Sequence, residues 1–254
     1  NGEMKIGNFK IKTNCPSNYL RQILADYKSP NFDYLPPFTG GLVGYFSYDY
    51  LKYSESTVKC NAQNLENFKD IDLMLFDEVI VFDNIKQKII LIVNMSLNDL
   101  ETEYNKAVIK LNRLIDLLCN GKKKNELGGK LLGKVTPLFN KEQFCNMVKK
   151  AKYHIHEGDI FQIVLSNQLS APFEGSLLNT YRILRTINPS PYMFYFSGTD
   201  VEIAGASPET LVKLENGILH TFPLAGTKPR GKNKKEDKAL EIKLLSDEKE
   251  LAEH

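Results

Sequence analysis

Two cations, a hydroxyl group, two glycines and two prolines lie within nine residues in the C-terminal part of the chain, at Pro223–Gly231. Lys228 and Arg230 carry charge suited to a carboxylate or a phosphate. Gly226 lets a ligand approach the backbone, because no side chain stands in the way. The segment fits an anion site. It fits equally well a turn stiffened by proline whose cations are solvated, and composition does not separate the two.

A second group of reactive side chains follows at the C-terminal end. Asp247 and Glu250 have the Asp-x-x-Glu spacing of a capping box, which predicts a short helix. Glu250, Glu253 and His254 then share one helix face. Carboxylate oxygens suit a hard cation such as Mg²⁺. Acidic residues at a helix start are also favoured by the helix dipole, and without further information this is the simpler interpretation.

Alternating strands and helices must position these groups. Asn140 and Gln143 predict a capped helix that ends at Gly158. A strand is predicted over 159–169 and a helix over 176–187. Further strands are predicted over 192–196, 201–206, 210–214 and 218–222, and the last two are joined by a turn at 215–217.

The first half carries weaker signals. A strand-like alternation over 4–11 precedes a helix capped by Ser17, and the glycine-rich stretch 38–49 lacks Walker spacing and is read as a strand with close backbone neighbours. Residues 71–94 predict a hairpin that turns around 83–84. A helix over 97–118 is expected, with Ser96 and Asp99 as its capping box and Gly121 just past its end. The Lys/Gly-rich segment 121–134 is the best linker, which divides the chain into domains 1–134 and 135–254.

Composition excludes several classes of protein. The 254 residues are 42% hydrophobic and 25% charged, with a formal net charge of +2 and interleaved signs, which gives no argument for nucleic acid. The four cysteines show no metal-ligand spacing and indicate free thiols in a reducing cytosol. No apolar run is long enough to cross a membrane. Position 1 is not Met, and side chains suited to chemistry stand at the very end, so we expect a piece of a longer protein.

Five motifs in one order then resemble a known family, the chorismate-utilising enzymes, and within it the anthranilate synthase component I branch. They are Gly158–Val164, Asn188–Met193, Gly205–Glu209, Pro223–Gly231 and Glu250–His254. In the first half, Gly40–Tyr45 and Asp72–Phe76 are similar as well. The resemblance implies an α+β fold, a two-sheet β-sandwich with helices packed outside. The residues alone also leave a mainly parallel α/β sheet open.

The resemblance also implies that this chain is an internal fragment. Members of the family extend further at both ends, with an N-terminal segment that holds part of a tryptophan site and a C-terminal part of the catalytic domain. We therefore expect the 254-residue chain alone to form no anthranilate from chorismate.

Two positions indicate the branch of the family. Ala225 stands where aminodeoxychorismate synthases typically carry a nucleophilic lysine, and Gln162 stands where isochorismate and salicylate synthases use a lysine base. A glutamine cannot take a proton from water. Both residues point to a lyase in which ammonia attacks chorismate. Aminodeoxychorismate synthase, some members of which lack the lysine, and a non-catalytic tryptophan-binding module are the alternatives.

By the same resemblance, ammonia comes from a partner glutamine amidotransferase, L-tryptophan is a feedback inhibitor, Mg²⁺ is the cofactor and the cytoplasm is the location. Strand packing is the alternative role of the residues assigned to tryptophan. The site residues implied are Glu209, Gln162 and Thr227 for catalysis, Gly226 and Thr227 for chorismate, Pro191, Tyr192 and Met193 for tryptophan, and Glu253 and Glu250 for the metal.

Overall fold

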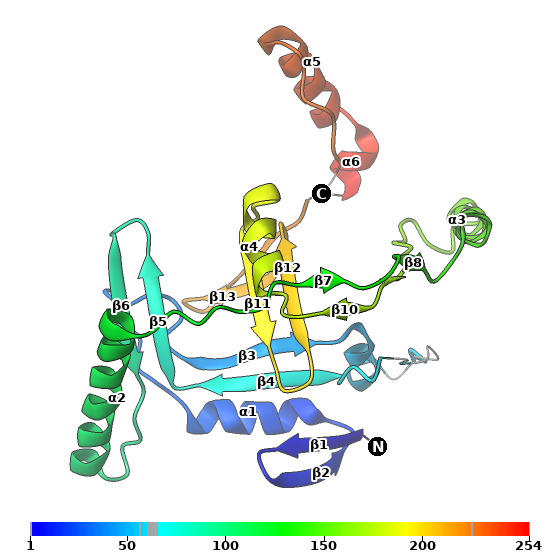
Figure 1. Ribbon diagram of the computed structural model, residues 1–254. Coiled ribbons are helices and arrows are strands. Elements are labelled where there is room, and N and C mark those ends of the chain that lie inside the picture. The colour runs from blue at the N-terminus through cyan, green and yellow to red at the C-terminus, as the bar shows by residue number, and fades with distance from the viewer. Residues whose placement is uncertain (1, 56, 60–63, 65, 225, 254) are drawn as a thin grey trace. The chain divides into compact units, whose positions relative to one another are not determined.

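The protein is described by a computed structural model that covers residues 2–55, 57–59, 64, 66–224 and 226–253 (Figure 1). Helices and strands alternate along the chain. In chain order they are β1 (Gly2–Ile6), β2 (Phe9–Thr13), α1 (Pro16–Asp26), β3 (Gly41–Phe46), the 3-10 helix η1 (Tyr48–Tyr53), β4 (Ile71–Phe76), β5 (Glu78–Asp83), β6 (Lys88–Val93), α2 (Leu100–Asn120), β7 (Lys130–Leu131), β8 (Thr136–Pro137), α3 (Lys141–His156), β9 (Leu169–Ser170), β10 (Phe173–Glu174), α4 (Leu178–Ile187), β11 (Tyr192–Ser197), β12 (Glu202–Ser207), β13 (Thr210–Glu215), β14 (Ile218–Phe222), α5 (Lys234–Leu245) and α6 (Glu248–Glu253).

The chain divides into two units, Asn1–Lys123 and Lys124–His254. This division falls inside the Lys/Gly-rich segment 121–134. The later part of that segment is not a loop, because Lys130 and Leu131 form β7 and pair with β10. The second unit therefore begins before residue 135.

The strands pair two by two. Each pairing between labelled strands in the described part of the chain is antiparallel, as in the hairpins β1–β2, β5–β6, β11–β12 and β13–β14. Antiparallel pairs joined by short turns, with helices between them, make the fold α+β. Among the residues described, the mainly parallel sheet that the residues alone left open is not found.

The glycine-rich stretch in the first unit is a strand, as predicted. β3 pairs with β4, and a Cβ placed on Gly44 would overlap the backbone of Asp72 on the neighbouring strand. The predicted hairpin over 71–94 was partly wrong, because residues 71–76 pair with β3 and only β5 and β6 form a hairpin. The chain changes partners at Asp77, whose carbonyl accepts a hydrogen bond from the Asn94 N–H at 2.8 Å.

The two predicted helices of the first unit form with different caps. Asp99 is the N-cap of α2 and accepts a hydrogen bond from the Thr102 N–H at 3.3 Å, so the helix begins one turn later than the Ser96 cap predicted. Gly121 ends α2 in an extended conformation, with φ −61°, and not in the left-handed one expected. α1 starts at Pro16 and shows no side-chain cap, so the Ser17 cap was wrong as well.

Helix α3 opens the second unit with the predicted capping box. The Asn140 side chain accepts from the Gln143 N–H, and the Gln143 side chain accepts from the Asn140 N–H, each at 2.9 Å. The strand predicted over 159–169 was wrong, since only Leu169 and Ser170 are paired, with β8. An apolar alternation becomes a strand only where another strand supplies its hydrogen bonds, and none of the described strands lies beside 159–168.

Helix α4 packs on the β11–β12 hairpin (Figure 1). The Glu202 carboxylate accepts hydrogen bonds from the Leu177 N–H and the Tyr195 hydroxyl, each at 2.7 Å, and from the Ser176 hydroxyl at 3.3 Å. The pKa of Glu202 lies below its usual 4.5, mainly because of the Leu177 N–H and then the Tyr195 hydroxyl. The Tyr181 ring of α4 lies 6.0 Å from the Tyr195 ring. A carboxylate on β12 thus satisfies an N–H group at the start of α4, where the N-cap residue Leu177 has no side-chain cap of its own.

The next hairpin is much more exposed. β13 and β14 turn at Asn216 and Gly217, whose φ values of 51° and 79° suit an Asn-Gly hairpin turn. Apolar side chains stand out on both strands, including Leu211 at 91% and Leu219 at 70% exposure. Helix α5, which follows, was not predicted, because its charged sequence has no apolar periodicity.

None of the helices among the residues described is both long enough and apolar enough to cross a membrane.

Candidate functional site

The loop after β14 is fastened to helix α5 by an arginine fork. Arg230 donates to Asp237 from Nε at 2.8 Å and from Nη2 at 2.5 Å, and the Gly231 N–H donates to the same carboxylate at 2.8 Å. These donors lower the pKa of Asp237 to about 2, with the Arg230 hydrogen bond as the largest cause. Arg230 therefore holds the loop to α5, and it is neither a solvated cation nor free to bind an anion with its whole guanidinium group.

The same loop meets helix α6. Lys228 Nζ lies 4.0 Å from an oxygen of Asp247, the residue just before the helix. Asp247 accepts from the Glu250 N–H at 3.4 Å, which is the first half of the predicted capping box. A Cβ placed on Gly226 would overlap the Glu250 carboxylate. Two residues assigned to different ligands, chorismate and the metal, are thus brought into contact.

Glycine at position 226 leaves space for Glu250. A larger residue would require that carboxylate to move, because its Cβ would overlap the carboxylate carbon. Glu250 is half-buried and Thr227 is exposed. Their neighbours Ala225 and the Glu253 side chain, on which the nucleophile and metal predictions also depend, lie outside the residues and side chains described.

The residues assigned to tryptophan and one residue assigned to catalysis meet at one end of the β11–β12 hairpin. Tyr192 pairs with Ser207, and the Tyr192 hydroxyl shares a hydrogen bond of 2.5 Å with the Thr210 hydroxyl. Between them, the Ser207 hydroxyl lies 3.4 Å from both the N–H and the carbonyl of Glu209. The Glu209 side chain is exposed beside this turn, as is Pro191, whereas Met193 is half-buried.

Gln162 stands apart from both groups. It lies exposed in the irregular segment between α3 and β9, next to Phe161, which is 84% exposed. The Gln162 side chain forms no hydrogen bond with any residue that the structure describes. The structure therefore assembles two groups, the loop with α6 and the hairpin end, and leaves Gln162 outside them.

Two residues that organise these groups were missed from the sequence. Asp237 holds Arg230, and Thr210 bonds Tyr192. Asp247 was expected as a helix cap, but not as the partner of Lys228. One signal was present, because Asn233 and Glu236 have the spacing of a capping box and the Asn233 side chain caps α5 at 2.9 Å. It would have placed Asp237 in the first turn of a helix close to Arg230.

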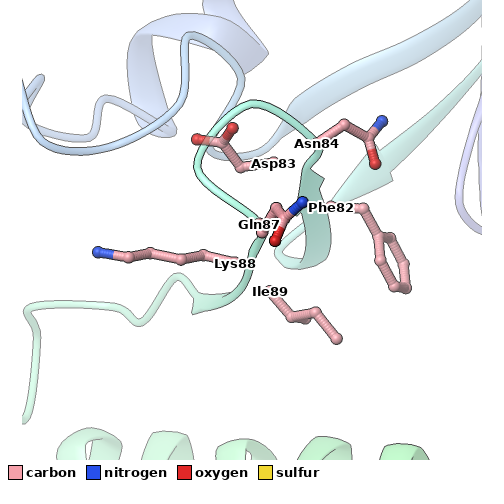
Figure 2. Close-up of a pocket in the computed structure, with 6 residues that line it drawn as sticks. All are labelled: Phe82, Asp83, Asn84, Gln87, Lys88 and Ile89. Atoms are coloured by element: carbon pink, nitrogen blue, oxygen red, sulfur yellow. The ribbon is translucent and has the colours of Figure 1, made fainter.

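A surface hollow lies elsewhere, at the turn of the β5–β6 hairpin (Figure 2). Asp83 accepts from the Ile85 and Lys86 N–H groups there, at 3.1 and 2.9 Å. Gln87 has φ 51°, which completes the turn. None of the predicted site residues lines this hollow, so we assign it to the turn itself.

Comparison with known proteins identifies the family. Residues 8–254 match the family described as chorismate binding enzyme. Anthranilate synthase component 1 of Acetivibrio thermocellus is 43% identical over 253 residues, which cover 94% of this chain and 50% of that protein. That of Aquifex aeolicus is 40% identical over 254 residues, with 96% and 50% covered. The crystal structure of anthranilate synthase component I from Streptococcus pneumoniae matches with a TM-score of 0.80 and 33% identity, covering 100% of this chain and 55% of that one.

The chain therefore belongs to the chorismate binding enzyme family. The resemblance inferred from five motifs is confirmed, and the α+β fold is that of the Streptococcus pneumoniae protein. The chain spans about half the length of the curated relatives it matches, 50% in the two named above.

Proposed function

We propose that the protein acts as the large subunit of an anthranilate synthase. In this reaction chorismate and ammonia give anthranilate, pyruvate and water, so the enzyme is a lyase. The similarity to component 1 proteins over nearly the whole chain supports the proposal. The structural observation that carries it is the contact between Gly226 and Glu250, because it joins a backbone able to hold a carboxylate-rich substrate to a carboxylate able to hold a cation.

Chorismate is a dicarboxylate, and the loop is built to present N–H groups and cations to it. The Gly226 N–H and the Thr227 hydroxyl are the proposed contacts, and Thr227 also takes part in catalysis. Lys228 Nζ lies 4.0 Å from Asp247, beyond hydrogen-bond distance, so its ammonium group can still donate to a ligand. Arg230 is already forked onto Asp237, so we assign it to the loop and not to the substrate.

Magnesium fits the residues present. The described residues contain no cluster of three or more His, Cys, Asp or Glu side chains that could hold a metal. Mg²⁺ commonly takes only one or two protein carboxylates and fills its other positions with water and substrate. Glu250 offers one at a place that only glycine leaves open, and Glu253 is the proposed second. The bound cation would act as a Lewis acid on the substrate's ring carboxylate.

The exposed Glu209 is the proposed acid, base or orienting group, and Gln162 a neutral hydrogen-bonding neighbour. A partner glutamine amidotransferase supplies the ammonia, L-tryptophan binding at Pro191–Met193 inhibits the enzyme, and the cytoplasm is the proposed location. These proposals rest on the motif positions alone.

The test uses the full-length protein with chorismate, ammonium and Mg²⁺. Anthranilate fluorescence and coupled pyruvate detection should rise together. Aminodeoxychorismate without pyruvate would identify the folate-pathway alternative, and tryptophan binding with inert chorismate would identify the regulatory module.

Two matched variants test the observation behind the proposal. Glu250→Gln should raise the Mg²⁺ concentration needed for half-maximal rate on the order of tenfold or more. Glu248→Gln, an exposed residue on the same helix, should leave it unchanged. Gly226→Ala should behave like Glu250→Gln, because the added methyl group must displace that carboxylate. Equal effects of Glu248→Gln and Glu250→Gln would contradict the assignment.

A further inference from the structure

The hydrogen bond between Tyr192 and Thr210 joins two segments that have different proposed tasks. Tyr192 is the first residue of β11 and belongs to the segment assigned to tryptophan. Thr210 is the first residue of β13 and directly follows Glu209, the proposed catalytic carboxylate. Their hydroxyl oxygens are 2.5 Å apart. The bond therefore ties the turn that contains Glu209 to the segment assigned to tryptophan.

The backbone reinforces this connection. Tyr192 is the register partner of Ser207, the last residue of β12. The turn from Ser207 to Thr210 is short, contains Pro208, whose ring fixes one backbone angle, and is closed by the contacts of the Ser207 hydroxyl with Glu209. A displacement of Tyr192 is thus transmitted to Glu209 from both sides of the turn, through Ser207 and through Thr210.

The opposite end of the hairpin is fixed. Glu202 joins β12 to the start of α4 through Leu177 and to β11 through Tyr195. With that end anchored, we expect a ligand that displaces the hairpin to act on the end where Tyr192, Ser207 and Thr210 meet. Tyr192 is 42% exposed, so a ligand can reach it.

We infer that the Tyr192–Thr210 hydroxyl pair couples tryptophan binding to the position of Glu209. Tyr192 is then a positioning residue for the catalytic turn as well as a part of the inhibitor site. The inference rests on the proposed function, since the reaction and the inhibitor are those proposed above. Its new content is the physical link, and Thr210, which no motif marked, becomes the residue that transmits inhibition.

The experiment measures coupling in the full-length protein with ammonium as the nitrogen source. The quantity is the ratio of kcat/KM for chorismate without tryptophan to that at saturating tryptophan. At saturation this ratio is independent of how tightly tryptophan binds, so it reports coupling only. Calorimetry gives the tryptophan affinity separately.

Thr210→Val removes the hydroxyl and keeps the shape. It should lower the coupling ratio about fivefold, the change in an equilibrium that one lost hydrogen bond typically makes, and should leave the tryptophan affinity within about twofold. Tyr192→Phe should lower the ratio to a similar value, and the double variant should be no lower than either single one, because all three break one bond. Thr210→Ser, which keeps the hydroxyl, should restore the parent ratio.

Thr221→Val is the matched control. Its hydroxyl donates to the Leu211 carbonyl at 3.3 Å across the β13–β14 hairpin and not to Tyr192. It should keep the parent ratio. If Thr210→Val melts well below the parent, the coupling ratio is measured on Tyr192→Phe instead, because that variant breaks the same bond.

Failure of the inference can be told apart from failure of the proposed function. A parent enzyme that makes anthranilate, is inhibited by tryptophan and shows an unchanged ratio in Thr210→Val overturns the inference and leaves the proposed function standing. The same holds if Thr210→Ser loses coupling as fully as Thr210→Val. A parent that makes no anthranilate, or that tryptophan does not inhibit, overturns the corresponding part of the proposed function and the inference with it.

Discussion

The two hairpins of the second unit have similar lengths and different surroundings. In β11–β12 each residue of β12 is at least half-buried, Phe196 is 9% exposed, and α4 packs on one face. In β13–β14 most positions are exposed, and Leu211 is 91% exposed. Yet predicted site residues stand next to both hairpins.

The difference lies in how those residues are held. The first hairpin is held by packing and by the Glu202 carboxylate. The second is tied at its start by the hydrogen bond of Tyr192 with Thr210, and the loop that follows it is fastened to α5 by Arg230 and Asp237. An exposed hairpin is thus connected to its surroundings by single hydrogen bonds where the first hairpin is connected by packing. Four changes test this contrast, from the largest expected effect to the smallest.

Phe196→Ala and Leu211→Ala should differ most. Loss of the buried Phe196 ring should lower the free energy of unfolding by about 3 kcal/mol through lost packing and an added cavity. Loss of the exposed Leu211 side chain should cost under about 0.5 kcal/mol. Urea denaturation of the full-length protein measures both. A large cost for Leu211→Ala would break the contrast, since it would show that another part of the folded protein covers the second hairpin.

Glu202→Gln should destabilise the first hairpin by roughly 1–2 kcal/mol, because a neutral acceptor replaces a carboxylate that receives three hydrogen bonds. The effect should depend on pH. The pKa of Glu202 is lowered in the folded state, so its contribution is present above the ordinary value of 4.5 and is lost as pH falls through the folded value.

The measurement is the unfolding midpoint of parent and Glu202→Gln between pH 7 and pH 3. The gap between the two curves should close on the acid side. Glu174→Gln, at an exposed position on β10, is the control and should cost little at pH 7. A Glu202→Gln gap that does not change with pH would sink the assigned role of the carboxylate.

Gly217→Ala should cost about 1 kcal/mol through backbone strain alone. Its φ is 79°, and an added Cβ would meet open space. Gly205→Ala in the first hairpin is the matched case, since its Cβ would overlap the Phe194 ring and force that side chain to move. We expect the larger loss of stability at Gly205, as thermal melting of both variants would show. A reversed order would mean that turn conformation matters more than packing in these hairpins.

Breaking the hydrogen bonds between Arg230 and Asp237 should have the smallest effect on stability, because the pair is exposed. The Asp237 carboxyl should nevertheless titrate at a distinctly low pH. The pKa of this carboxylate is about 2 in the folded protein. The attachment of the loop to α5 is thus present above the ordinary value of 3.8 and is lost only as pH falls toward 2. Carboxyl NMR of the labelled protein should place the pKa of Asp237 well below its ordinary value of 3.8, and Arg230→Gln should raise it. A titration near 4 in the parent would contradict the fork.

What the sequence could predict was local. The Asn140–Gln143 capping box and the Asn-Gly turn at 216 depend on neighbours a few residues away, and both were confirmed. The strand expected over 159–169 was wrong, because a strand depends on a partner that periodicity does not reveal. For the same reason Thr210 and Asp237 were missed, since their importance comes from Tyr192 and Arg230.

The site was predicted unevenly as well. The motifs named Gly226 and Glu250 separately, and only the structure showed that one is glycine to make room for the other. Alternation predicted the strand that begins at Tyr192, but not the direction in which its hydroxyl points. Family motifs thus supplied the residues, and tertiary contacts supplied the relations between them.

The turn of the first hairpin sets a limit on how this protein can evolve. The Gly198 N–H donates to the Val201 carbonyl at 2.8 Å, and this closure fixes the register from Ser197–Glu202 to Tyr192–Ser207. Because side chains alternate between faces, one inserted residue that shifted the pairing would exchange the faces of one strand. After such a shift, either the hydrogen bonds of the Glu202 carboxylate or the hydrogen bond between Tyr192 and Thr210 could still form, but not both. We therefore expect the length of this loop to tolerate change far less than its sequence.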